Sequence, residues 1–206
     1  MSIIVEHEKR RREILEKALD AFMDEGFEDV TFQKIADRCG ITRTTLYTYF
    51  KNKGDMFNFS IKQFLSALEN DIAEIRTVKG LSHEEKLVKV MIVIIERLEE
   101  NRLLLSVVMD YLIYLFKNEH DPGYRVRRRT VRLRHILTTM LIEGIKAGEF
   151  LSSVNVRDAN ELLYGLVEAV IFRLVVLRKP SAGELKDAVI LAVERLTGKN
   201  PQAQES

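Results

Sequence analysis

The chain has 206 residues, of which 46% are hydrophobic and 31% charged, the profile of a globular protein long enough to bury a core. Its net charge of +1 gives no information about binding partners. Any anion or nucleic-acid site must therefore come from local clustering of basic residues. The single cysteine, Cys39, excludes a disulfide framework and a cysteine-based zinc site. We find no secretory signal and no apolar run near the roughly 18 residues that span a bilayer, and therefore expect a cytoplasmic protein.

Apolar residues recur at spacings of three and four along the whole chain, which predicts an all-α protein of about nine helices. Helices are expected over residues 8–25, two within 31–51, and then over 54–79, 83–99, 102–118, 124–147, 156–178 and 182–197. The first three are short and joined by tight turns, whereas the rest are long. We therefore expect an N-terminal domain over residues 1–53, a larger helical domain over 54–200 and a flexible tail over 201–206.

Two short helices within residues 31–51 carry clear start and stop signals. Thr31 and Thr42 each precede a helical pattern and are suited to cap it, and Gly40 between them is suited to end the first helix. Two helices joined by a short turn that contains glycine form a helix-turn-helix layout.

The second of these helices separates an apolar side from a side rich in hydrogen-bond donors when it is rotated by about 100° per residue. Leu46, Tyr49 and Phe50 fall on the side that we expect to pack. The other side carries the polar residues Arg43, Thr44, Tyr47, Thr48 and Lys51. Such groups read phosphate oxygens and base edges in a major groove. An ordinary solvated helix face remains the alternative from the pattern alone.

Local charge favours the DNA interpretation. Between Lys34 and Lys53 the sequence has five basic residues and one acid, which gives +4. The acids of the first helix bring the charge of residues 1–54 back to about zero. We therefore expect the positive charge to be confined to one face, the face that meets DNA. A second basic run, Lys9–Arg12, either grips phosphates beside the groove or forms a solvated helix start.

The run TFQKIADRCGITRTTLYTYFKNKGDMF, residues 31–57, closely resembles the DNA-binding module of the tetracycline-repressor (TetR) family. Matching positions are Thr31, Ile35, Ala36, Gly40, Thr45, Leu46, Tyr47, Tyr49, Phe50 and Lys53. Cys39 stands where the family usually has alanine, a change between small residues. The resemblance implies that Thr31, Tyr47 and Lys53 contact phosphates. It places Arg43, Thr44 and Thr48 nearest the bases, and Lys51 facing the DNA backbone.

The resemblance also implies a homodimer formed through the last two helices and a cavity for a small-molecule effector within the larger domain. Candidate cavity residues are Met91, Ile95, Met109, Leu112, Phe116, Met140, Tyr164, Glu168 and Phe172. Their composition predicts an apolar or amphipathic effector. Met and aromatic residues at helical spacing also form plain core, and that alternative stays open for each.

Charged residues within the larger domain raise two further questions. The acids Asp110, Glu143 and Glu168 lie between apolar residues. A buried carboxylate there needs a cationic ligand or an internal arginine such as Arg173, or else the helix simply exposes the acid. Residues 125–134 contain six arginines. We expect the arginines to be solvated and paired with acids such as Glu96, Glu99 and Glu100, or else to recognise an anionic ligand or DNA phosphate.

No catalytic constellation emerges from the sequence. The four histidines are scattered, and no nucleophile elbow, phosphate-cradling glycine loop or metal-ligand motif is found, so we expect neither an enzyme nor a cofactor or metal. The expected function is a sequence-specific, DNA-binding transcriptional regulator: a homodimeric repressor, released from a palindromic operator by its effector, with no membrane partner. The alternative is a DNA-bound structural or cell-division control protein of the same fold without an inducer.

Overall fold

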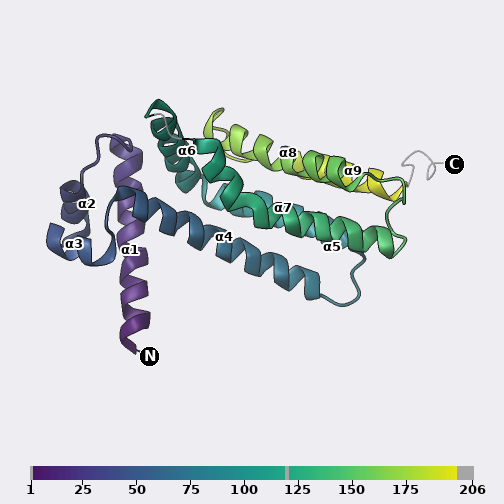
Figure 1. Ribbon diagram of the computed structural model, residues 1–206, viewed down its shortest axis with the longest axis horizontal. Coiled ribbons are helices and arrows are strands. Elements are labelled where there is room, and N and C mark those ends of the chain that lie inside the picture. The colour runs from purple at the N-terminus through teal and green to yellow at the C-terminus, as the bar shows by residue number, and fades with distance from the viewer. Residues whose placement is uncertain (1, 119–120, 199–206) are drawn as a thin grey trace. The chain divides into compact units, whose positions relative to one another are not determined.

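A computed structural model describes residues 2–118 and 121–198, and within them the chain forms nine α-helices and no strand (Figure 1). The helices are α1 (Ser2–Glu25), α2 (Phe32–Cys39), α3 (Arg43–Tyr49), α4 (Lys53–Thr77), α5 (His83–Glu100), α6 (Arg102–Lys117), α7 (Pro122–Lys146), α8 (Val156–Val175) and α9 (Glu184–Thr197). The prediction of an all-α protein is confirmed. The expected tail lies outside the described residues.

Most predicted helix ends agree with the structure to within two residues, with two exceptions. Helix α1 begins at Ser2 rather than near residue 8, and α8 ends at Val175 rather than near residue 178. In the described ranges, no helix is both long and apolar enough to cross a membrane.

The helices group into two compact units that do not follow the chain order. The first unit contains residues 1–66 and 102–122, and the second contains residues 67–101 and 123–206. Helix α4 therefore begins in the first unit and ends in the second. The division into domains at residue 53 stays a prediction, and the structure adds that α6 packs with the N-terminal helices.

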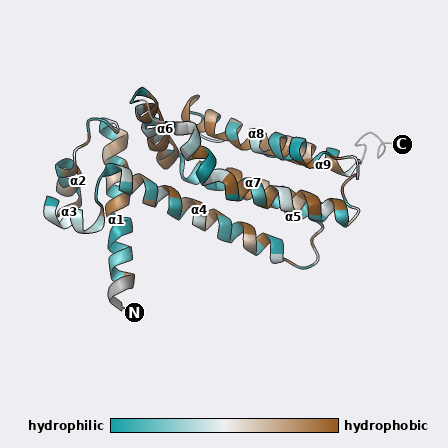
Figure 2. Ribbon diagram, viewed as in Figure 1, coloured by the Kyte–Doolittle hydropathy of each residue, from teal (hydrophilic) through white to brown (hydrophobic). Residues whose placement is uncertain are grey.

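The first unit is built around an apolar core to which α1, α2, α3 and α6 all contribute. Phe22, Ile35 and Leu46 are fully buried in it, and Tyr111 of α6 stacks on Phe57 with ring centroids 5.1 Å apart. The helices are amphipathic, and Figure 2 shows hydrophobic and hydrophilic residues alternating along them. Packing rather than intrinsic helix propensity thus holds the short, threonine-rich α3 in place.

The second unit packs α8 and α9 against α5. Helix α5 buries one continuous side, made of Leu87, Val90, Met91, Ile94, Ile95 and Leu98. Its first turn is fixed by a capping box, in which Ser82 accepts from the Glu85 amide and Glu85 accepts from the Ser82 amide. Helix α5 is therefore fixed at its start and buried along one side, and α8 and α9 pack against it.

Candidate DNA-binding surface and effector site

Helices α2 and α3 are held by the capping residues that the sequence predicted. The Thr42 hydroxyl accepts a hydrogen bond of 3.1 Å from the Thr45 amide, and Thr31 caps α2 by accepting one of 3.2 Å from Lys34. Gly40 ends α2 with φ of +65°, a left-handed conformation that glycine adopts without strain. The helix-turn-helix is therefore confirmed as the local structure.

The polar side of α3 faces solvent, and its apolar side is buried. Leu46 is completely buried, whereas Tyr47 is 47% exposed. The structure leaves exposed all five residues predicted on the polar side, namely Arg43, Thr44, Tyr47, Thr48 and Lys51. Their contacts with DNA remain predictions, and their accessibility is what such contacts require.

Two of these side chains support one another. An Arg43 guanidinium nitrogen donates to the Tyr47 hydroxyl over 3.1 Å, and the Tyr47 ring packs on Phe32 with centroids 5.0 Å apart. Arg43 is thus positioned through a ring that α2 holds. A preordered guanidinium loses less conformational entropy when it binds a base or phosphate.

Lys53 has a structural role that the sequence did not reveal. Its ammonium donates to the carbonyl oxygens of Phe27 over 2.7 Å and Glu28 over 3.1 Å, and it lies 4.7 Å from the centre of the Phe27 ring. Burial lowers the pKa of this ammonium, although Asp29 and Glu28 act in the opposite direction. The third N–H group remains to serve the predicted phosphate contact.

The predicted positive patch is smaller than the sequence count suggested. Lys34 pairs with Glu25 at 2.5 Å and Arg38 pairs with Asp24 at 2.7 Å, so acids at the end of α1 neutralise both. The acids of the first helix were counted from the sequence, but their pairing with Lys34 and Arg38 is visible only in the structure. The remaining basic residues of that segment are Arg43, Lys51 and Lys53.

The basic run on α1 is divided between ion pairs, ring contacts and solvent. Arg10 pairs with Glu13 at 2.8 Å, and the Arg11 guanidinium lies over the rings of Phe50 at 4.8 Å and Phe59 at 3.9 Å. Lys9 and Arg12 are exposed. Their proposed grip on phosphates stays a prediction.

The structure distributes the predicted effector residues among several environments. Met91, Ile95, Met140 and Tyr164 are buried in the second unit, and Met109 and Leu112 are half-buried in the first. Phe116, Glu168 and Phe172 are exposed. A cavity of about 350 Å³ occurs in the second unit, and Met140 is one of its lining residues. The role of all nine in effector binding stays a prediction.

Each of the three acids that lie between apolar residues follows one of the alternatives left open, namely exposure or pairing with an arginine. Glu143 accepts from Arg76 over 3.0 Å, Asp110 and Glu168 are exposed, and Arg173 pairs with Glu184 rather than with an internal acid. None of these three acids is therefore a buried, unpartnered carboxylate in the described residues.

The arginine run on α7 also finds other partners than predicted. Arg132 pairs with Glu69 at 3.0 Å, and Arg134 pairs with Glu161 at 2.5 Å while lying 3.8 Å from the centre of the Tyr164 ring. The acids predicted as partners, Glu96, Glu99 and Glu100, bind other groups, namely Lys186, the Ser181–Ala182 turn and Arg97. The prediction of pairing with these acids is wrong because helical periodicity does not reveal which helix lies opposite.

In the described parts of the chain, no group of three or more His, Cys, Asp or Glu residues is arranged to hold a metal ion. The capped two-helix unit with an exposed, donor-rich second helix defines the class of the protein: a helix-turn-helix DNA-binding protein.

Comparison with known proteins gives the family. Residues 14–58 match the model for bacterial regulatory proteins of the tetR family. The chain is 27% identical to the fatty acid metabolism regulator protein of Bacillus subtilis, over 77% of this chain and 80% of the relative. It is also 27% identical to the transcriptional repressor KstR2 of Rhodococcus jostii, over 75% of this chain and 74% of the relative.

Solved structures show the same fold. The KstR2 regulator of Mycobacterium tuberculosis matches with a TM-score of 0.70 at 21% identity, covering 92% of this chain and 96% of its own. The FadR regulator of Bacillus subtilis in complex with stearoyl-CoA matches with a TM-score of 0.68 at 24% identity, covering 92% and 99%. The chain belongs to the TetR family, and it is a DNA-binding transcriptional regulator rather than an enzyme.

Proposed function

We propose that this regulator is a homodimeric repressor that binds a palindromic operator and is released from it by a small, apolar or amphipathic effector. The observation that carries the DNA-binding part is the exposed side of α3. There Arg43, Thr44 and Thr48 face solvent on a helix fixed by its Thr42 cap and its buried Leu46. We assign these three residues to the bases, and Thr31, Tyr47, Lys51 and Lys53 to the phosphates.

An apolar stripe on α8 supports the homodimer. Leu162 is 54% exposed and Phe172 is 52% exposed, and a β-carbon added to Gly165 would meet open space. Val176 and, on α9, Leu191 are also large and exposed. A row of such residues along one helix favours a self-complementary contact with a second copy, since a two-fold axis lets one surface bury itself.

The names of the relatives support repression and an effector. The Rhodococcus relative is named a repressor, the Bacillus relative a regulator of fatty acid metabolism, and the FadR structure contains stearoyl-CoA. These names favour an effector with a substantial apolar part. The cavity in the second unit favours this function over a DNA-bound structural protein without an inducer.

Helix α4 supplies a physical link between effector and DNA. It is one continuous helix from Lys53, beside the DNA-binding surface, to Thr77, which lines the cavity. We propose that the effector shifts α4 and so changes the separation of the two recognition helices in the dimer. For this to release DNA, the effector must bind the conformation that does not fit DNA more tightly.

Selection of bound duplexes from a random DNA pool tests this function. The proposal predicts one enriched palindrome whose half-sites lie about one helical turn apart, or a multiple of it, because a two-fold dimer places two identical helices in successive major grooves. Enrichment of a single half-site without symmetry would contradict the dimeric mode, and no enrichment at all would contradict specific binding.

A further inference from the structure

The cavity in the second unit lies where the end of α4, the start of α5 and the end of α7 meet. Helix α4 contributes Ala73, Arg76 and Thr77, and α7 contributes Met140 and Glu143. Helix α5 contributes His83 and Lys86. The volume of about 350 Å³ is at the lower end of the range for small-molecule sites. The site thus suits a small organic molecule or one end of a longer one.

Positive charge exceeds negative charge among the lining residues. Arg76 and Lys86 carry two positive charges, and Glu143 carries one negative charge. One guanidinium nitrogen of Arg76 donates to both Glu143 oxygens, at 3.0 and 3.3 Å. The other N–H groups of Arg76 are not used in that pair, so Arg76 keeps donors for a second anion.

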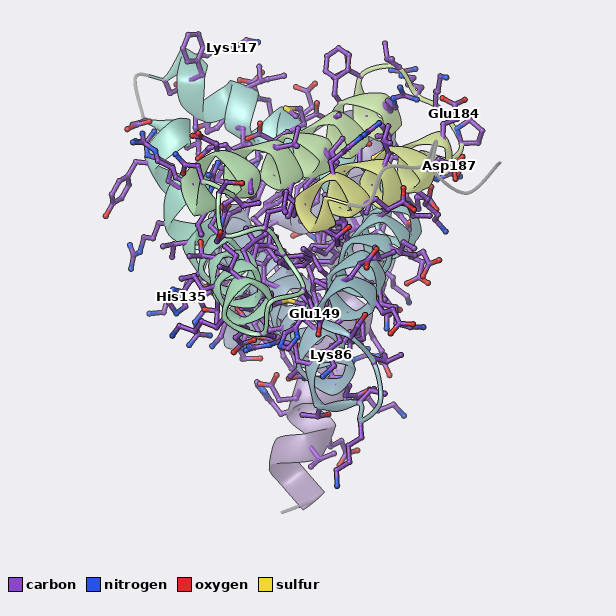
Figure 3. All side chains as sticks on the ribbon, turned by 90° about the vertical axis from the view of Figure 1, so that its right-hand side faces the viewer. Lys86, Lys117, His135, Glu149, Glu184 and Asp187 are labelled. Carbon is purple, nitrogen blue, oxygen red and sulfur yellow. The ribbon has the colours of Figure 1, made fainter. Side chains whose placement is uncertain are left out.

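Of the two cationic side chains that line the cavity, Lys86 has no counterion among the described residues. It is half-buried, and its ammonium makes no hydrogen bond or ion pair within residues 2–118 and 121–198. An ammonium without a protein partner at the wall of a cavity is free to bind an anion there, as charge-assisted hydrogen bonds favour. Figure 3 shows Lys86 and Glu149 at the same end of the unit.

The nearby acids are already occupied and do not neutralise Lys86. Glu149 accepts from the His83 amide over 2.5 Å, from the His83 ring over 2.8 Å and from the Glu84 amide over 3.3 Å. Burial raises the pKa of Glu149, but these hydrogen bonds outweigh it and hold that pKa below its ordinary value. Glu85 is engaged in the capping box with Ser82.

The apolar part of the lining decides what kind of anion fits. Met140 is buried, and Ala73 lies on the opposite helix. Neither offers a polar group, so a fully hydrated inorganic anion gains little there. An anion that carries an apolar chain satisfies both parts of the site.

We propose that this cavity binds the anionic end of an amphipathic organic acid, with Lys86 and Arg76 as its cationic ligands and Met140 in contact with the adjoining apolar chain. This assignment rests on the proposed function, because it makes the cavity the site of the effector's charged group. Glu143 competes with the ligand for Arg76 and therefore limits affinity. The contacts of Arg76 and Thr77 would act on the last turn of α4, the helix that begins at Lys53.

Calorimetric titration of the full chain with octanoate, and with 1-octanol as its uncharged counterpart, tests the proposal. Octanoate is expected to bind at least about tenfold more tightly than 1-octanol, since charge-assisted hydrogen bonds form only with the carboxylate. Lys86→Gln should weaken octanoate binding by about tenfold, whereas Glu143→Gln should strengthen it several-fold. The matched control is Lys89→Gln, on the same helix, exposed and outside the cavity lining, which should change nothing.

Opposite effects of the two substitutions exclude general loss of structure as their cause. The proposal is overturned if Lys86→Gln and Lys89→Gln behave alike, or if Glu143→Gln weakens binding. Operator binding measured in the same samples distinguishes failure of the effector assignment from failure of the proposed repressor function. Octanoate binding through Lys86 that leaves operator affinity unchanged overturns the effector assignment alone. Absence of operator binding without octanoate contradicts the proposed function instead.

Discussion

In the first unit, the residues expected to meet DNA cluster on and around one seven-residue helix, α3, and all of them except the half-buried Lys53 are exposed. In the second unit, the residues expected to meet the effector are dispersed, with Met91 fully buried and Phe172 half exposed. The DNA-binding surface is built from residues close together in sequence. Its helix caps, its turn and its polar side all lie within 27 residues, 31–57. The cavity proposed for the effector is lined by helices far apart in sequence. The family model accordingly matches only residues 14–58, in the first region.

The largest effect is expected from a substitution in the proposed dimer interface of the second unit. Phe172→Glu places a carboxylate on the exposed apolar stripe of α8 and should convert the proposed dimer to a monomer, as measured by light scattering. Operator affinity should fall by roughly 100-fold or more, because the second half-site is no longer bound intramolecularly.

Phe116→Glu is the matched control for this substitution. Phe116 is 74% exposed on α6, outside the proposed interface, so the dimer should persist. A dimeric Phe172→Glu variant, or a monomeric Phe116→Glu variant, would place the interface elsewhere.

Leu46→Ala tests the claim that packing holds α3. Its side chain is fully buried, so truncation should lower the free energy of unfolding by about 2–5 kcal/mol, as measured by urea denaturation. Thr44→Ala, on the exposed side of the same helix, should stay within about 0.5 kcal/mol of the parent chain. Equal losses for both variants would argue against a buried side of α3.

Arg43→Ala probes base reading by the exposed side. If Arg43 contacts a base, the substitution should cost about 1–3 kcal/mol on the preferred operator and much less on unrelated duplexes, as measured by fluorescence anisotropy. Lys51→Ala provides the comparison, because a backbone contact is lost equally on every sequence. A uniform loss for Arg43→Ala would reassign Arg43 to the phosphates.

Lys53→Ala gives the smallest expected effect. The plot of log affinity against log salt concentration should become shallower by about one unit, since one phosphate contact is lost. Lys79→Ala, outside the DNA-binding module, should leave the slope unchanged. A lower melting temperature with an unchanged slope would show that Lys53 serves only the carbonyls of Phe27 and Glu28.

The sequence predicts features whose causes lie within a few residues. Thr31, Thr42 and Gly40 act on amides and carbonyls three or four positions away, and the fold class and both caps were therefore predictable. The same holds for the orientation of α3, because Leu46 and Tyr47 point to different sides of any helix that contains them.

Features that depend on which helix lies opposite were not predictable. Tyr111 stacks on Phe57 across 54 positions, and Glu143 pairs with Arg76 across 67. Helical periodicity shows that a residue faces inward or outward, but it does not name its neighbour. The cavity around Lys86 was missed for this reason, since its lining comes from three separate helices.

The most direct test of the central claim is binding to a labelled duplex from upstream of the gene that encodes this chain. The binding is measured across a salt series with excess competitor DNA. We expect saturable binding of one dimer per site that resists competitor and that octanoate reverses. Mass spectrometry first establishes that the protein carries no bound small molecule. If competitor DNA then abolishes binding at every salt concentration, the result contradicts a specific regulator at this site.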